Sequence, residues 1–132
     1  MILIFGALIG FISVAFGAYA EHGLREAVSE ENFRFLMTAI RYNQVNAVVV
    51  SAIGIALLNG GKLASITTLR WSGVLFIAGT VLFSFSIYLS VLLDIPSFVN
   101  VTPVGGITIM GAWLLLLVAA IWASKKMSKN VL

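Results

Sequence analysis

Four long apolar blocks constrain this chain more than any other feature of its sequence. They run from Ile2 to Ala20, Val45 to Leu58, Trp71 to Leu93 and Val104 to Ala123, and none contains a charged side chain. A helix needs about 20 mostly apolar residues to cross the hydrocarbon core of a bilayer. The first, third and fourth blocks are long enough alone, whereas the second must recruit the polar residues that precede it. The blocks therefore predict a protein that crosses a membrane four times.

The predicted fold is all-α: a polytopic bundle of four transmembrane helices in one domain, residues 1–132. Only 10% of the 132 residues are charged, whereas a soluble domain carries about 25%. The formal net charge of +3 does not indicate nucleic-acid binding, because Lys and Arg in membrane proteins mainly reflect orientation. The expected partner is the lipid bilayer. The chain has no cysteine, which excludes disulfides and thiolate metal sites.

The distribution of basic residues predicts the orientation. With four spans, one side of the membrane carries both termini and the second loop, with Lys62, Arg70, Lys125, Lys126 and Lys129. The other side carries Arg25, Arg34 and Arg41. The side richer in Lys and Arg is usually cytoplasmic. We therefore expect an integral protein of the bacterial inner membrane with both termini in the cytoplasm and the first and third loops outside.

Small residues form stripes along the predicted spans. Gly6, Gly10, Ser13 and Gly17 share one face of the first span, and Gly105, Ala112 and Ala119 recur every seven residues in the fourth. Such stripes let two helix backbones approach closely in a membrane, where packing drives helix association. They predict tight seams, either within one chain or between chains.

The connecting segments carry helix-boundary signals. Gly23 is suited to end a helix in the left-handed conformation, and Ser29 to cap the start of the next one. Thr102 followed by Pro103 is the pattern of a cap and first residue. From Glu30 to Arg41 the sequence predicts an amphipathic helix, because its apolar residues recur at helical spacing. This segment lies on the outer membrane surface or runs unbroken into the second span.

Polar residues collect where the blocks begin and end, on the predicted outer face. We take them as a candidate binding cluster: Glu21, His22, Tyr42, Asn43, Asn46, Tyr88, Asp94 and Thr102. Polar groups at membrane depth are candidates for function. The alternative is structural, since helix ends must satisfy their free backbone groups and these side chains would cap helices and tie the outer ends together. We favour the structural interpretation.

Several short motifs carry a family resemblance. They are Gly17-Ala18-Tyr19-Ala20-Glu21-His22-Gly23-Leu24, Thr38-Ala39-Ile40-Arg41-Tyr42, Phe83-Ser84-Phe85-Ser86-Ile87-Tyr88, Thr102-Pro103-Val104-Gly105-Gly106 and Gly111-Ala112-Trp113. In this order they resemble the YgdD-like family of small inner-membrane proteins, the "domain of unknown function 423" family. The resemblance covers essentially the whole chain. It implies a four-helix membrane protein and no particular activity. Family members usually have a small residue at the position of Glu21 and often a histidine at that of Asn46.

The titratable residues predict neither a metal site nor a catalytic one. His22 is the only histidine, and catalytic zinc uses about three protein ligands. Two histidines for a haem are also lacking. We therefore predict no cofactor and no catalytic residue. Imidazole changes charge near neutral pH, so His22 could sense pH, but a hydrogen bond at a helix end is the interpretation we favour.

Three functions fit the sequence. The first, which we favour, is a structural or accessory membrane subunit that packs with itself or with a larger membrane complex. The second is a passive channel or transporter for a small solute, because the spans lack the internal carboxylate of proton-coupled carriers. The third is an enzyme acting on a lipid or quinone through His22, Glu21 or Asp94. No nucleophile elbow or paired-carboxylate motif supports the enzyme, so we expect a protein without enzymatic activity.

Overall fold

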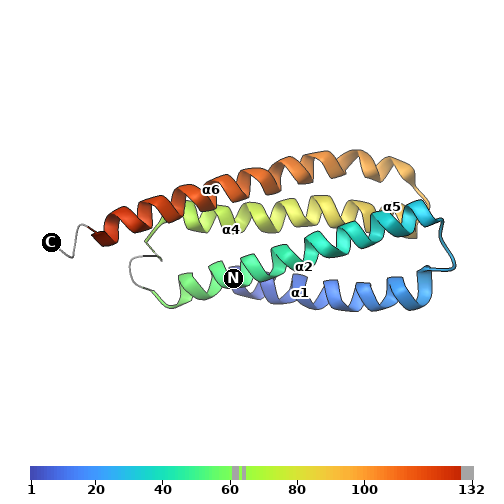
Figure 1. Cartoon of the computed structure of the whole chain (residues 1–132), viewed down its shortest axis with the longest axis horizontal. Coiled ribbons are helices and arrows are strands. Elements are labelled where there is room, and N and C mark those ends of the chain that lie inside the picture. The colour runs from blue at the N-terminus through green and yellow to red at the C-terminus, as the bar shows by residue number, and fades with distance from the viewer. Residues whose placement is uncertain (61–62, 64, 129–132) are drawn as a thin grey trace.

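Four long helical rods lie side by side in the structure (Figure 1). The computed structural model describes residues 1–60, 63 and 65–128, and every regular element in these residues is helical. All four rods are long and apolar enough to cross a membrane: Ile2–Leu24, Glu30–Leu58, Thr67–Leu92 and Pro96–Lys126. The predicted four-span helical fold is confirmed. Lys62 and Lys129, counted above to predict the orientation, lie outside the described residues.

Three of the four rods change helix type along their length. The first consists of α1 (Ile2–Tyr19) and the π-helical turn η1 (Ala20–Leu24), and the second is α2 (Glu30–Leu58) alone. The third consists of α4 (Thr67–Thr80), the π-helical turn η2 (Val81–Phe85) and α5 (Ser86–Leu92), and the fourth of the 3-10 helix η3 (Pro96–Val101) and α6 (Thr102–Ser128). The chain runs up and down, so η1 and η3 share the end of the bundle opposite the termini. We call this the distal end and the other the proximal end.

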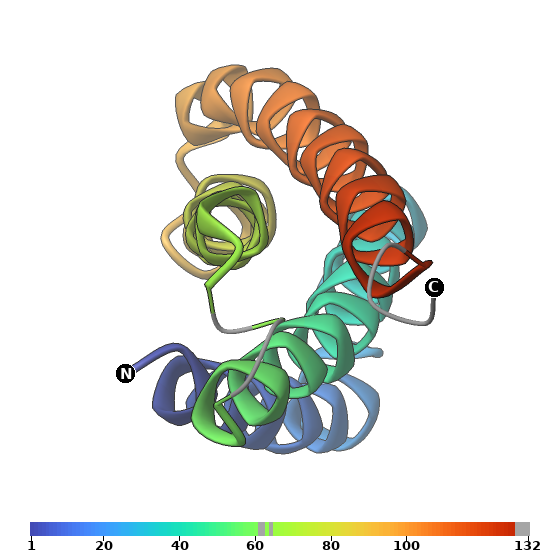
Figure 2. The ribbon, with the colours of Figure 1, turned by 90° about the vertical axis from the view of Figure 1, so that its left-hand side faces the viewer.

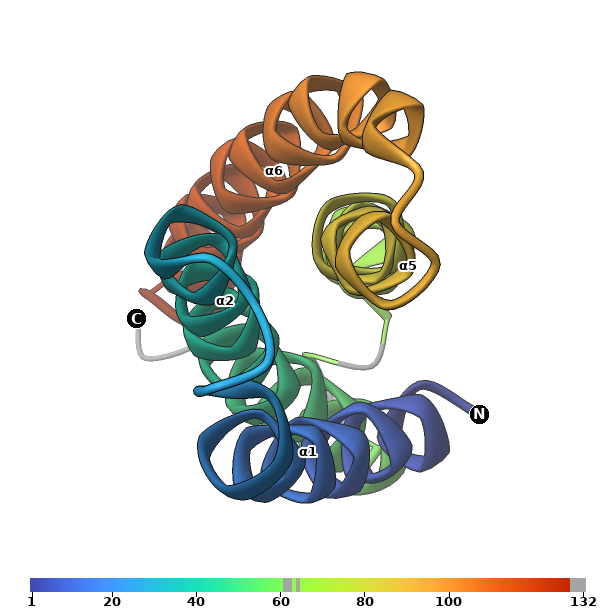
Figure 3. The ribbon, with the colours of Figure 1, turned by 90° about the vertical axis from the view of Figure 1, so that its right-hand side faces the viewer.

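The rods associate as two pairs. α1 packs along α2, α4 packs along α6, and α2 joins the pairs by contacting the α4–α5 rod. Seen from either end, α1, α2 and α6 form a curved row, with the α4–α5 rod on its concave side (Figures 2 and 3). The buried apolar residues fall into two clusters. One includes Val50 and Phe76 in the proximal half, and the other includes Leu36 and Ile87 in the distal half.

The second rod is one unbroken helix. Ser29 caps it as predicted, with its Oγ accepting a hydrogen bond from the backbone N of Asn32 at 3.2 Å. The segment predicted as an interfacial helix, 30–41, forms the first part of α2, so the alternative of an unbroken helix is the one observed. At 1.5 Å per residue, α2 extends about 43 Å, more than the roughly 30 Å of a hydrocarbon core.

The small-residue stripes form seams within the chain. A Cβ on Gly6 would lie 2.7 Å from the backbone nitrogen of Ser51, and one on Gly54 would lie 2.6 Å from the Cα of Leu3. Only glycine permits α1 and α2 to approach this closely. Gly105 plays the same role for α6, because its Cβ would meet the backbone of Phe83 in η2. The predicted seams are confirmed, and they join helices of the same chain.

Two of the predicted boundary residues have other roles. Gly23 was expected to end a helix in the left-handed conformation, but it lies inside the π turn η1, beside the ring of Tyr19. Thr102 was expected to be an N-cap. Its backbone is already helical (φ −54°, ψ −44°), because η3 runs directly into α6. The Thr102 hydroxyl is therefore available to another helix.

Candidate functional site

A buried polar cluster adjoins the distal apolar cluster, which also includes Tyr88. It contains Asn43 and Asn46 of α2, Thr80 at the end of α4, Ser84 in η2 and Tyr88 in α5, and each is at most 3% exposed. Two further members, Ser86 and Thr102, extend it toward α6. Thr80 lies halfway along the third rod, so the polar cluster reaches from the middle of the bundle toward the distal end.

At the middle of the bundle, side-chain hydrogen bonds connect α2 to the third rod. The Asn46 Nδ2 donates to the Thr80 Oγ1 at 2.9 Å, and the Thr80 hydroxyl donates to the Phe76 carbonyl at 2.6 Å. One turn farther, the Ser84 hydroxyl donates to the Ala39 carbonyl at 2.9 Å. In hydrocarbon, a polar group without a partner costs several kcal/mol. These bonds therefore allow polar side chains to be buried at membrane depth.

The π turn η2 brings the third rod close to both neighbours. It contains Ser84, which reaches the α2 backbone, and Phe83, whose backbone lies against Gly105 of α6. A π turn holds one more residue than an α turn, and such turns often occur at functional sites. The absence of a side chain at Gly105 accommodates the wider turn.

Asn43 has hydrogen-bonding capacity that the described residues do not use. Its Nδ2 donates to the Tyr88 Oη at 3.2 Å, while its Oδ1 is buried and has no hydrogen-bond partner among them. Aromatic rings enclose this pair. The ring of Phe16 stacks on Tyr88 with 4.0 Å between centroids, and the ring of Phe85 tilts against it at 5.6 Å. The arrangement can hold one more hydrogen-bond donor, but it contains no charged group.

The polar cluster also joins α5 to the start of α6. The Oγ of Ser86 and the Oγ1 of Thr102 lie 2.8 Å apart, and Ser86 also donates to the Phe83 carbonyl at 2.9 Å. The structure thus places four of the eight sequence-predicted site residues in the polar cluster: the buried Asn43, Asn46 and Tyr88, and the half-buried Thr102. Tyr42 stays at its margin, 45% exposed, with its ring 4.9 Å from that of Phe83.

Three sequence-predicted site residues lie outside the polar cluster. Glu21 forms an exposed ion pair with Arg25, 2.7 Å away, and His22 is exposed. Asp94 ends a helix: it adopts a left-handed conformation (φ 54°), and the backbone N of Ile95 donates to the Ser90 carbonyl at 3.0 Å. This is the hydrogen bond of a Schellman motif. Within the described part of the chain, no three His, Asp or Glu residues are grouped to hold a metal ion.

Sequence reasoning missed the central members of the polar cluster. Thr80 and Ser84 lie within an apolar block and were not assigned to any site. Their four-residue spacing places them on one helix face, as the three-residue spacing does for Asn43 and Asn46. The polar cluster could therefore have been found in the sequence from two polar helix faces, one in each of two spans. A search restricted to the ends of the apolar blocks overlooks these faces.

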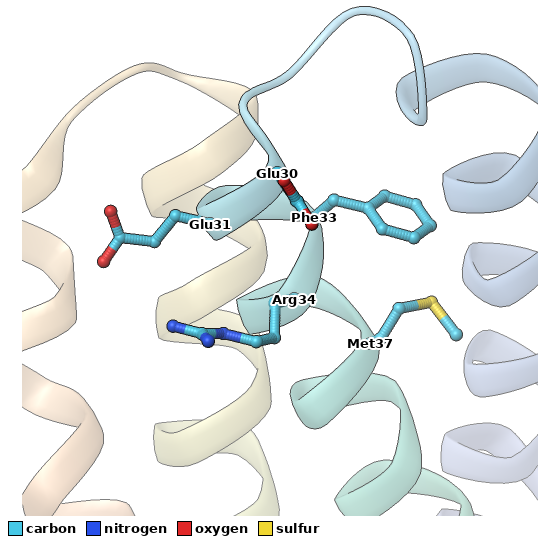
Figure 4. Close-up of a pocket in the computed structure, with 5 residues that line it drawn as sticks. All are labelled: Glu30, Glu31, Phe33, Arg34 and Met37. Carbon is cyan, nitrogen blue, oxygen red and sulfur yellow. The ribbon is translucent and has the colours of Figure 1, made fainter.

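A separate, shallow groove lies on the surface of α2 at the distal end. It has a volume of about 650 Å³ and is lined by Glu30, Glu31, Phe33, Arg34 and Met37. Figure 4 shows Phe33 and Met37 pointing to one side of the helix and Glu31 and Arg34 to the other. Its two acidic side chains and one basic side chain distinguish it from the neutral polar cluster.

Comparison with known proteins identifies relatives along nearly the whole chain. The inner membrane protein YgdD of Escherichia coli K12 is 34% identical over 124 residues, which cover 94% of this chain and 92% of YgdD. The membrane protein SAB0533 of Staphylococcus aureus is 31% identical (90% and 93% covered), and YwdK of Bacillus subtilis is 29% identical (90% and 94% covered).

Comparison with solved structures gives no significant match. The model of a family described as "Protein of unknown function (DUF423)" matches residues 16–106. The resemblance of the sequence motifs is confirmed, and the chain is a membrane protein that belongs to the DUF423 family.

Proposed function

We propose that this protein is a structural or accessory subunit, which packs as a rigid bundle with itself or with a larger membrane complex. The proposal rests on the chemistry of the polar side chains that are buried between the helices. These side chains are neutral, and their hydrogen bonds are made to neighbouring helices or to the backbone, as for Asn46, Ser84 and Ser86. Such bonds fix helices relative to one another, which suits a protein whose surface serves as a docking face.

The same interior argues against coupled transport. Proton-coupled carriers move a charge through ionisable groups inside the membrane. All five Asp and Glu residues of this chain lie at the distal end, at positions 21, 26, 30, 31 and 94. The glycine seams also bring α1 onto α2 and α6 onto η2 at backbone distance. Movement of these helices past one another would break contacts that only glycine permits.

The exposed side of α6 is the best candidate for the docking face. A Cβ on Gly111 would meet no heavy atom within 4 Å, unlike those on the seam glycines. Glycine destabilises a helix by about 1 kcal/mol relative to alanine, and among the described residues no close contact with another helix explains glycine at position 111. Small residues mark close helix contacts in membranes. A contact between Gly111 and another chain would explain its presence.

Co-purification tests this proposal. After cross-linking in membranes and extraction in mild detergent, we expect a homo-oligomer or a stoichiometric partner protein. Gly111→Leu should reduce the cross-linked species at least fivefold. Ala18→Leu, which adds similar bulk at an exposed position of α1, should not. A monomer that stays uncross-linked and conducts a neutral solute in proteoliposomes would contradict the proposal and favour a channel.

The proposal includes location and orientation. Relatives are named inner membrane or membrane proteins, and we infer a bacterial inner-membrane location with the distal end outside and both termini in the cytoplasm. The cysteine-free sequence permits a direct check. Ser97→Cys should react with a membrane-impermeant maleimide added to intact cells, whereas Ser128→Cys should react only after permeabilisation. Reaction of both from the same side would contradict the four-span topology.

A further inference from the structure

We propose that an apolar groove between α1 and α4 at the proximal end binds an anionic phospholipid, with an acyl chain in the groove and the phosphate paired to Arg70. The groove has a volume of about 640 Å³. Its walls include Ile2 and Phe5 of α1, Leu57 of α2, and Val74 and Ile77 of α4. Among the described residues that line it, Arg70 is the only one with a charged side chain.

The groove follows from the pairing of the rods. α1 packs along α2, and α4 packs along α6, so α1 and α4 share few contacts. The side chain of Ile2 reaches Gly73, where a Cβ would lie 3.2 Å from its Cδ1. Beside this contact the space between the two rods stays partly unfilled. A lateral groove with apolar walls in a bilayer is filled by lipid chains, because hydrocarbon is the surrounding solvent.

The charges at the proximal end select an anionic headgroup. All side-chain carboxylates of the chain lie at the distal end, so Arg70 has none to pair with. Arg70 is exposed in the first turn of α4, and Trp71 beside it is 57% exposed. Trp and Arg at a span end mark the interface where phospholipid headgroups lie. A guanidinium matches the geometry of a phosphate and can bind it through two parallel hydrogen bonds.

The position of Arg70 favours a phospholipid over a transmembrane helix of a partner protein. An anionic phospholipid carries its charge at the end of long apolar chains, and the groove has the guanidinium of Arg70 near the end of an apolar channel. The apolar side chains of its walls, Phe5, Val74 and Ile77 among them, offer no group for a specific hydrogen bond. The groove should therefore select lipids by the charge of the headgroup and should not distinguish acyl chains of similar length.

Native mass spectrometry of the full-length protein in detergent tests this assignment. We expect phosphatidylglycerol to bind about fivefold more tightly than phosphatidylcholine with the same acyl chains, as expected for one cation near an anionic headgroup. Arg70→Gln should abolish this preference. Lys125→Gln, which removes a cation at the same end of the bundle without changing the groove, should preserve it.

A second variant tests the groove itself. Val74→Trp adds bulk at a wall residue that is 39% exposed and should reduce the bound occupancy of both lipids several-fold. An unchanged preference in Arg70→Gln, or an equal loss in Lys125→Gln, would overturn the proposal, because general surface charge would then explain binding. A dimer that Val74→Trp dissociates would also overturn it and identify a second copy as the occupant. The Arg70 comparison remains decisive if Val74→Trp does not fold.

Discussion

Gly105→Ala is expected to lower the free energy of unfolding by about 3 kcal/mol, at the upper end for overpacking a closely packed site. The added methyl group would meet the backbone of Phe83, 2.7 Å from its Cα, and the carbonyl carbon of Leu82 at 2.8 Å. A backbone cannot rotate away as a side chain can. α6 must therefore move away from η2, and that movement would also stretch the hydrogen bond between Ser86 and Thr102.

Reversible unfolding in mixed detergent micelles, followed by tryptophan fluorescence, measures this effect. Gly106→Ala provides the matched control, because it adds the same methyl group at the next position of the helix, where the nearest atoms, in the ring of Phe83, lie at the ordinary contact distances of 3.8 and 3.9 Å. This control should match or slightly exceed the parent protein in stability, since alanine favours helix more than glycine does. Equal losses in both variants would mean that the α6–η2 contact does not hold the bundle together.

Asn46→Asp is expected to cost about 3 kcal/mol, the scale on which a charged residue near the bilayer centre resists insertion. The two side chains have nearly the same shape, so packing is preserved. The substitution removes the amide donor to Thr80 and places a negative charge in a position that is 1% exposed. No basic residue of the chain lies within its four apolar blocks to compensate.

Asn46→Leu separates the charge from the lost hydrogen bond. It removes the bond to Thr80 without adding charge, and the Thr80 hydroxyl keeps its bond to the Phe76 carbonyl. Hydrogen bonds between membrane helices contribute about 0.6 kcal/mol on average, so this variant should lose 1 kcal/mol or less. The unfolding measurement should therefore separate the two variants by about 2 kcal/mol. Equal stabilities would indicate that water reaches the polar cluster, which would favour a conducting role.

The sequence was sufficient to predict the four spans and their packing seams. Both depend on local information: the length of an apolar run and the spacing of small residues such as Gly6 and Gly105. The π turns η1 and η2 could not be predicted, because a π turn arises from tertiary contacts and has no distinct residue pattern. The role of Gly23 was wrong for this reason, since η1 extends the first rod past it.

The candidate site was predicted only in part, because hydropathy locates a residue along the membrane normal but not around the bundle. Asn43 and Tyr88 come together because α2 is adjacent to the third rod. His22 occupies a similar predicted depth but is exposed. Asp94 was grouped with them because it is a polar residue at the outer end of a block, whereas its backbone conformation explains its position at a helix end.

The π turn η2 determines how the distal half of the third rod faces relative to the proximal half. Each residue of an α-helix advances about 100° around the axis, so the same sequence wound as an unbroken α-helix would turn Tyr88 about 100° away from Asn43 while leaving Thr80 beside Asn46. Because the π turn holds one more residue than an α turn, it absorbs this rotation and keeps both pairs facing each other. A deletion of one residue within Val81–Phe85 would convert the turn to α-helix and leave the distal half of the rod facing as it does now, so this turn is a place where chain length can change without disturbing the polar cluster.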